Sequence, residues 1–363
     1  MSETSQYIML YTHIIPVRGY SRSILMDLYK SKYLFIPNYF CDFLIENKSK
    51  LIQRNDFLNL GITQYDKEEI SELVNELLNQ DYFIESDRDL IESLQIEIKD
   101  KTEDSVITDC IIELSQYSEW DVNFFLREIN KLGVKFLEIR FLDFSSFSNL
   151  FSLIKEALTD HSIEYLHFLV PFDKDLENVI KTELNKFNRI NQLTIYNSKN
   201  TFEIKDETFD IVYSSQESIC TSQCGCVNPG YFSYSLTNYA NHLKNNSCLS
   251  SKLSIDQFGE IKNCPSKKES FGKLKNVNIQ QIIRSEVFQQ DWNITKNSIL
   301  ICSDCEFRWM CSDCRVFVQD ESNRFSKPSK CGYNPYINKW NTEQGYLTEA
   351  ECGISIINNR VSI

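Results

Sequence analysis

Seven cysteines gathered in the last third of the chain constrain its fold more than any other feature. They lie between Cys248 and Cys331, and five residues separate the two close pairs, Cys302-x2-Cys305 and Cys311-x2-Cys314. Both pairs enclose the dipeptide Ser-Asp. Thiolates at such spacings can converge on one ion or cluster, because a tight turn points neighbouring sulfurs to the same side. Burial as small hydrophobes would explain scattered cysteines such as Cys41, but not this spacing. The pattern therefore predicts metal or cluster binding.

Length and charge favour reduced thiols over disulfides. A chain of 363 residues predicts two or three domains, with cores large enough to fold without disulfides. The first residues lack a basic segment typical of secretion, and no apolar run approaches the ~20 residues of a membrane span. The net charge of -13 disfavours a nucleic-acid partner, and the four histidines lie apart from the cysteine cluster. We expect a cytoplasmic protein with no membrane segment.

Residues 1–95 are predicted to form a small domain of strands and helices. Strand-forming segments at 7–17, 23–28 and 32–36 precede helical patterns from Asn38 and over 66–79, and 81–86 closes as a wing strand. This order resembles the winged-helix peptide-recognition element of enzymes that mature ribosomally made peptides; an ordinary winged helix is the alternative. A precursor peptide would add as a strand. The candidate peptide-binding residues are Tyr33, Leu34, Phe35, Ile70 and Leu73.

Residues 103–215 are predicted to form a degenerate, partial βα barrel. Strand-like segments begin 28 residues apart, at Val106, Val134, Ser162 and Ile190, and amphipathic helical patterns fill the gaps between them. Right-handed crossovers would make these strands parallel, in an open sheet or partial barrel. No Gly-rich phosphate loop follows any strand, so we expect this domain to be a scaffold.

The C-terminal region, 216–363, carries a family resemblance. The spacing Cys248-x10-Gly259-x4-Cys264, followed by the later cysteines, resembles the seven-cysteine SPASM domain of many radical-AdoMet peptide-modifying enzymes. One spacing departs, with two residues before Cys314 where three are usual. The closing segment 330–336, with Trp340, is similar to the SPASM-domain peptide maturase of grasp-with-spasm systems. The resemblance implies an α/β protein whose partners are a precursor peptide and an ATP-grasp ligase.

The same resemblance implies two [4Fe-4S] clusters. The first would be held by Cys226, Cys248, Cys264 and Cys314, with Cys220 or Cys224 as alternatives to Cys226. The second would be held by Cys302, Cys305, Cys311 and Cys331. Two structural zinc sites are a competing interpretation of the close pairs.

Cleavage of AdoMet is not expected. Radical-AdoMet enzymes usually place Cys-x3-Cys-x2-Cys after the first barrel strand, but the loop 115–120 contains no cysteine. We therefore expect an accessory maturation protein that binds no AdoMet, and we assign it no catalytic residue. The alternative is a radical enzyme in which Cys220, Cys224 and Cys226 hold a third cluster; this near match follows the βα repeats, where no barrel remains to hold AdoMet.

Overall fold

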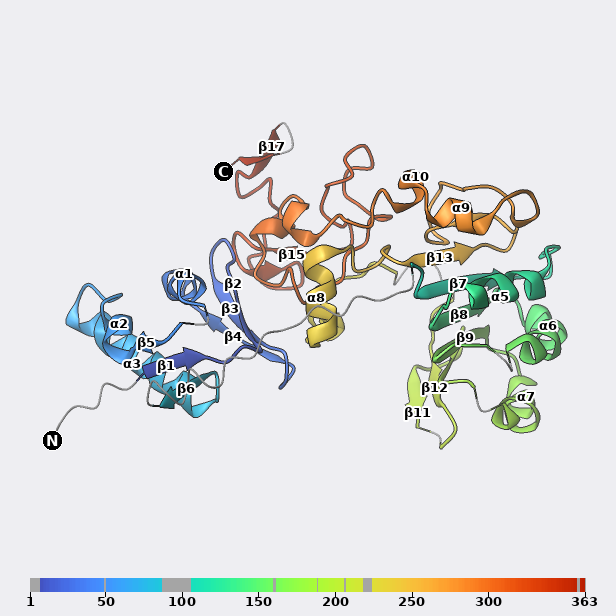
Figure 1. Ribbon diagram of the computed structural model, residues 1–363, viewed down its shortest axis with the longest axis horizontal. Helices are drawn as coiled ribbons and strands as arrows, with labels where there is room; N and C mark the ends of the chain where they lie inside the picture. Colours follow the sequence, from blue (N-terminus) through green and yellow to red (C-terminus); the bar gives the residue numbers. More distant parts are fainter. Residues whose placement is uncertain are drawn as a thin grey trace.

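The computed structural model describes residues 7–48, 50–86, 106–158, 161–187, 189–205, 207–217, 224–357 and 360–362. Figure 1 shows an elongated molecule with the N-terminal part at one end and a helix-covered sheet at the other. The cysteine-rich region lies between them. The fold is mixed α/β with a central, mostly parallel sheet, as the sequence predicted. Within the described residues, no helix is long and apolar enough to span a bilayer.

The N-terminal part contains two small antiparallel sheets and three helices. The predicted strand segment 7–17 is divided into β1 and β2, which belong to different sheets, and β5 and α2 were not foreseen; the other strands and helices occur where the sequence predicted them. One sheet has the order β2 (Ile14–Val17), β3 (Ser23–Asp27), β4 (Lys32–Ile36), and the other has the order β5 (Ile52–Gln53), β1 (Tyr7–Leu10), β6 (Phe83–Ser86). The helices are α1 (Asn38–Glu46), α2 (Arg54–Leu58) and α3 (Gln64–Asn79).

The sheet β2-β3-β4 is covered on both faces. Leu25 of β3 packs into the N-terminal core, whereas its neighbours Ile24 and Met26 pack against the cysteine-rich region in a core shared with Phe307. Every residue of β3 is buried. A strand covered on both faces loses the alternation of apolar and polar residues, which explains the continuous apolar run in its sequence. The N-terminal part is thus attached to the cysteine-rich region through its sheet.

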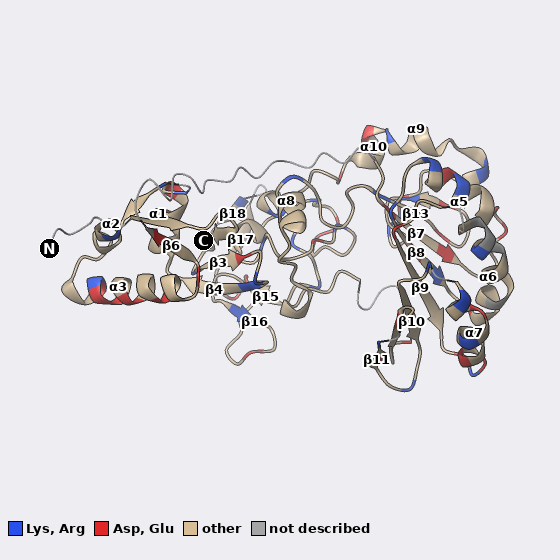
Figure 2. Ribbon diagram, turned by 60° about the horizontal axis from the view of Figure 1, so that its bottom comes forward, with Lys and Arg blue, Asp and Glu red and all other residues tan. Residues whose placement is uncertain are grey.

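The middle part is a parallel sheet with helices on one face. Its five predicted strands pair in parallel, and α5, α6 and α7 lie together on one side of them (Figure 2). The unforeseen strand β11 (Phe202–Ile204) adds antiparallel at the edge. The parallel strands are β7 (Asp109–Leu114), β8 (Phe136–Phe141), β9 (Tyr165–Pro171), β10 (Gln192–Tyr196) and β12 (Asp210–Tyr213). The helices are α5 (Val122–Lys131), α6 (Phe144–Leu158) and α7 (Leu176–Thr182).

This sheet continues into the cysteine-rich stretch. Strand β13 (Lys252–Ile255) pairs in parallel with β7, and β14 (Ile261–Lys262) pairs antiparallel with β13. Gly259 in the connecting turn has φ +79°, and a Cβ there would lie 3.0 Å from Trp120 Cδ1. Only glycine meets both demands without strain. The Gly259 of the sequence pattern therefore closes the hairpin that anchors the first cysteines to the central sheet.

The remaining chain is largely irregular. Its short helices are α8 (Leu236–Lys244), α9 (Ile279–Ile283) and α10 (Glu286–Gln289). Two small hairpins follow: β15 (Tyr333–Asn334) with β16 (Lys339–Trp340), and β17 (Ser355–Ile357) with β18 (Arg360–Ser362). Such a region cannot rely on regular hydrogen-bond ladders, so buried side chains must fix its loops.

Candidate metal centre

Four of the predicted ligands line one cavity. Cys302, Cys305, Cys311 and Cys331, called quartet II below, all lie in the wall of one small cavity. Cys302 and Cys305 bracket a 3-10 turn, and the preceding Ile301 has φ 68°. A β-branched residue rarely adopts this conformation, which costs on the order of 1–3 kcal/mol and must be held by its surroundings. The turn directs both of its thiols into the cavity.

Apolar side chains from three segments enclose quartet II. Phe307 and Tyr333 line the cavity and belong to the same core as Ile24 and Met26 of β3. Backbone and side-chain hydrogen bonds join the β2–β3 turn to the residues on either side of Cys305. Tyr20 N donates to Asp304 O over 2.7 Å, and Arg22 Nε donates to Glu306 Oε1 over 2.7 Å. The N-terminal sheet therefore packs behind residues that line this cavity.

A second set of four thiols is defined by the effect of neighbouring thiols on one another's pKa. The pKa of Cys224 is raised by burial and by the neighbouring thiols of Cys248 and Cys314. The pKa of Cys264 is raised to about 11 by burial and then by Cys248, with a smaller effect of Cys224. These four cysteines are called quartet I. Cys248 and Cys264 flank the hairpin β13–β14, so the central sheet positions half of the quartet.

Cys224, an alternative to Cys226 in the sequence analysis, lies near Cys248 and Cys314. The next residue, Gly225, has φ +78°, and a Cβ there would lie 3.0 Å from Cys314 Sγ. This glycine lets the backbone pass directly over the thiol. Cys226 precedes Val227, which forms a bridge with Cys331 of quartet II. Cys220 lies outside the described residues.

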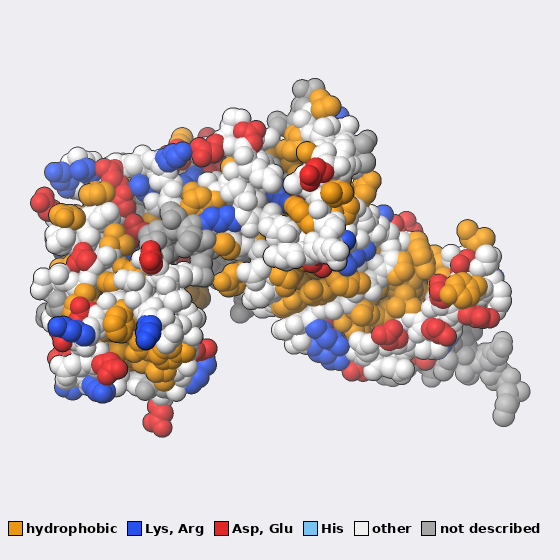
Figure 3. Space-filling view, turned by 180° about the vertical axis from the view of Figure 1, so that it is seen from behind, with side chains coloured by type: hydrophobic (Ala, Val, Ile, Leu, Met, Phe, Trp, Pro, Cys, Tyr) orange, Lys and Arg blue, Asp and Glu red, His pale blue; other side chains and the backbone are white. Residues whose placement is uncertain are grey.

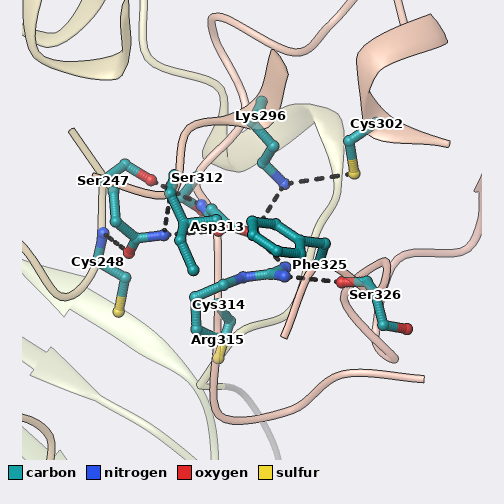
Figure 4. Close-up of polar contacts among 12 residues, drawn as sticks. Ser247, Cys248, Lys296, Cys302, Ser312, Asp313, Cys314, Arg315, Phe325 and Ser326 are labelled. Carbon is teal, nitrogen blue, oxygen red and sulfur yellow. Dashed lines mark hydrogen bonds and ion pairs between the residues drawn. The ribbon is translucent and has the colours of Figure 1, made fainter. Parts of the chain in front are cut away.

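A buried polar network joins the two quartets (Figure 4). Asn246, 1% exposed, accepts hydrogen bonds from the backbone of Cys248 and donates from Nδ2 to Asp313 Oδ2 over 2.7 Å. Asp313 lies next to Cys314 in the sequence, and its other oxygen is 3.3 Å from Lys296 Nζ. Arg315 also donates to that oxygen over 2.7 Å. Asp313 is therefore the junction between the loops that carry the two sets of thiols.

One lysine lies beside quartet I and two lie beside quartet II, and sequence reasoning missed all three. Lys252 Nζ is 3.8 Å from Cys248 Sγ, and Lys296 Nζ is 3.9 Å from Cys302 Sγ. Lys327, 2% exposed, donates to Tyr333 O over 2.7 Å and to Glu349. Each of these lysines is four to six residues from a cysteine of its quartet in the sequence. That proximity is a weak signal, because lysines are common throughout the chain.

The surroundings of Lys296 and Lys327 favour the protonated form of both side chains. Burial lowers the pKa of Lys296, but the negative charge that Cys302, Cys311 and Asp313 carry when ionised outweighs burial and raises that pKa well above its ordinary value. The pKa of Lys327 is raised in the same way, chiefly by Cys331 and Glu349. Conversely, burial raises the pKa of Cys311 to about 12 although Lys296 opposes it. The thiols thus need a bound cation to lose their protons.

The number of thiols in each set equals the ligand number of a [4Fe-4S] cluster. Among the described residues, no group of three or more Cys, His, Asp or Glu side chains is close enough together to hold one metal ion. Quartet II nevertheless surrounds a common cavity, and four thiols per site is the ligand number of a [4Fe-4S] cluster. Such clusters would supply one-electron redox chemistry or structural cross-linking at the two sites.

The predicted peptide-binding residues divide between core and surface. Ile70 is 1% exposed within the N-terminal core, and Leu34 and Leu73 pack against that core while partly exposed. Tyr33 and Phe35 face the other way, with ring centroids 5.5 Å and 6.2 Å from that of Phe307. Phe35 is 41% exposed, and β4 forms one edge of its sheet. Figure 3 shows apolar side chains gathered on the face of the molecule that is seen from behind.

Comparison with known proteins gives no family assignment. No family model and no curated protein matches the chain. Among solved structures, Streptococcus suis SuiB bound to S-adenosylmethionine is similar at 11% identity and a TM-score of 0.29, over 89% of this chain and 99% of that one. SuiB bound to its precursor peptide SuiA has 10% identity and the same TM-score and coverage. A TM-score this low does not establish a shared fold.

Proposed function

We propose that this chain is an iron–sulfur protein that holds two [4Fe-4S] clusters, one in quartet I and one in quartet II. The proposal is supported by four cysteines that line one cavity and by Cys248, which raises the pKa of Cys224, Cys264 and Cys314. The buried Asp313 network joins the loops that carry these two sets. Four thiolates per cluster leave no iron open to substrate, which favours structural or electron-transfer roles.

The wider role is maturation of a ribosomally synthesised peptide, with an ATP-grasp ligase as partner. This part of the proposal is supported by the sequence resemblance to SPASM-domain maturases and by the open edge of β4. An extended peptide could add to that edge through main-chain hydrogen bonds, while Phe35 and the partly exposed Leu34 and Leu73 offer apolar contacts. No step of a reaction is assigned to the chain itself.

The proposal includes an absence of AdoMet cleavage. Placing Cys224 in quartet I leaves only Cys220 and Cys226 of the three thiols that a third cluster would need. The loop that follows β7 offers serines instead of thiols: Ser118 Oγ donates to Gln257 O over 3.0 Å.

The test incubates the full-length, anaerobically reconstituted protein with dithionite, AdoMet and the candidate precursor peptide. Mass spectrometry should detect no 5′-deoxyadenosine above a protein-free control. Turnover that disappears when Cys220 and Cys226 are changed to Ala would replace the proposal with that of a radical enzyme.

A further inference from the structure

We propose that Arg22 makes the order of the β4 edge depend on a cluster in quartet II. Arg22 is here a positioning residue, because it links Phe35 of β4 to the loop that quartet II anchors. The inference rests on the proposed function, since it assumes that quartet II holds a cluster and that β4 binds the precursor peptide. It adds a form of control: loss of the quartet II cluster weakens peptide binding, and loss of the quartet I cluster does not.

The five residues 306–310, called the tethered segment below, lie between two thiols of quartet II. Cys305 precedes the segment and Cys311 follows it. Its backbone forms local turns, in which Cys311 N donates to Phe307 O over 3.0 Å. In the described part of the chain, no helix or strand lies within it. A cluster bound by the thiols at both ends would therefore contribute much of the free energy that orders this segment.

The tethered segment contacts β4 through two neighbouring side chains. The ring centroid of Phe307 lies 5.5 Å from that of Tyr33 and 6.2 Å from that of Phe35. Glu306 Oε1 accepts a hydrogen bond from Arg22 Nε over 2.7 Å, and the guanidinium carbon of Arg22 lies 3.7 Å from the centroid of the Phe35 ring. Both contacts thus reach Phe35, which is 41% exposed on an edge strand.

The pairing of Glu306 with Arg22 is strong because Glu306 is fully buried. A buried carboxylate is costly unless a cation and hydrogen-bond donors compensate it. Tyr333, which lines the quartet II cavity, donates its hydroxyl to the same oxygen over 2.5 Å, and Arg22 Nη2 donates to that hydroxyl over 3.1 Å. Arg22 is therefore held by Glu306, and disorder of the tethered segment would release the guanidinium from the Phe35 ring.

Quartet I has no comparable connection to β4 among the described residues. Cys264 packs in the core of the middle part, whereas Cys305 and Cys311 pack in the core that quartet II shares with β3. The Asp313 network that joins the quartets reaches quartet II at Cys302, outside the tethered segment. Loss of the quartet I cluster should therefore leave the β4 edge in place.

The test measures hydrogen exchange of the β4 amides and the affinity for the labelled candidate precursor, both with full-length protein reconstituted anaerobically. Cys311→Ala, which loses the quartet II cluster, should show faster β4 exchange and bind the precursor about tenfold more weakly. Arg22→Leu should show both changes while it keeps about eight irons, because only the contact to β4 is removed. Cys264→Ala, which loses the quartet I cluster, should match the wild type in both measurements.

Two further variants separate the coupling from general destabilisation. Arg54→Leu breaks another ion pair of the N-terminal part, with Glu85 over 3.1 Å, and should leave β4 exchange and affinity unchanged. The double variant of Arg22→Leu and Cys311→Ala should lose no more affinity than Cys311→Ala alone, because both substitutions act through one contact.

Wild-type exchange and affinity in Arg22→Leu would overturn the inference, as would equal effects of Cys264→Ala and Cys311→Ala, or losses that add in the double variant. Failure of the proposed function gives different results. Zinc without sulfide in the wild type rejects the clusters themselves. A wild type that does not bind the precursor, while β4 exchange still responds to Arg22→Leu and Cys311→Ala, rejects the peptide role and supports the coupling.

Discussion

The identity of the eighth ligand is a question about single residues. Cys224 and Cys226 are separated only by Gly225, yet the glycine's positive φ places Cys224 among the thiols of quartet I. Cys226 directly precedes Val227, whose backbone forms a bridge with Cys331 of quartet II. Sequence distance favoured Cys226 as the eighth ligand, whereas we propose Cys224, which lies near Cys248 and Cys314.

Replacing these two cysteines one at a time should give different iron contents. Cys224→Ala should lose up to four of about eight irons, because quartet I keeps only three thiols. Cys226→Ala should retain all of them. Iron and sulfide assays of both variants, purified anaerobically side by side, measure the difference; equal losses, or loss only in Cys226→Ala, would contradict the assignment.

A second residue-scale feature is the carboxylate of Glu138 on β8. Burial alone would raise its pKa, but the hydrogen bond from His167 and the positive charge of Arg140 outweigh burial and lower the pKa to about 2. His167 Nε2 in turn lies 2.8 Å from Thr194 Oγ1. Three adjacent strands are therefore joined across the open face of the sheet.

Glu138→Gln should lower the free energy of unfolding by roughly 2 kcal/mol at pH 7. Because the folded pKa is depressed, this contribution is complete above about pH 4.5 and is lost as the pH falls toward 2. The free energies of unfolding of the wild type and of Glu138→Gln should therefore become equal in acid. Urea unfolding at several pH values measures this, with Glu164→Gln, from an exposed ion pair, as a control that should change little. A constant difference at every pH would contradict the assigned pKa.

At the scale of elements, β4 connects the proposed peptide site to quartet II. Its side chains Tyr33 and Phe35 contact Phe307, and Phe307 lines the thiol cavity. Arg22 of the neighbouring turn lies 3.7 Å over the Phe35 ring and donates to Glu306, the residue after Cys305. A peptide on β4 would therefore lie near quartet II, although β4 and the quartet II cysteines are far apart in the sequence.

Phe35→Asp should weaken precursor binding by about tenfold, since a charge replaces apolar contact area at the strand edge. Fluorescence anisotropy of labelled precursor with the full-length protein measures the affinity. Tyr117→Asp changes an equally aromatic side chain, 66% exposed on the middle part, and should bind like the wild type. Unchanged affinity in Phe35→Asp, or an equal loss in Tyr117→Asp, would argue against β4 as the binding edge.

At the scale of the whole molecule, periodic sequence patterns predicted much of the fold. The 28-residue repeat placed β7, β8, β9 and β10, because alternating strands and helices have strong local signals. The joining of β13 to β7 could not be foreseen, since pairing between strands distant in sequence depends on the packing of the whole chain. The three lysines were missed for the same reason: their burial is a tertiary property, and only the cysteines carry a spacing pattern.

The measurement that tests the central claim most directly is the iron, sulfide and zinc content of the full-length protein purified without oxygen. Two clusters in quartets I and II predict about eight irons and eight sulfides per chain, with zinc far below one equivalent. About two zinc ions per chain with no acid-labile sulfide would contradict the account, because the same thiols would then form structural zinc sites.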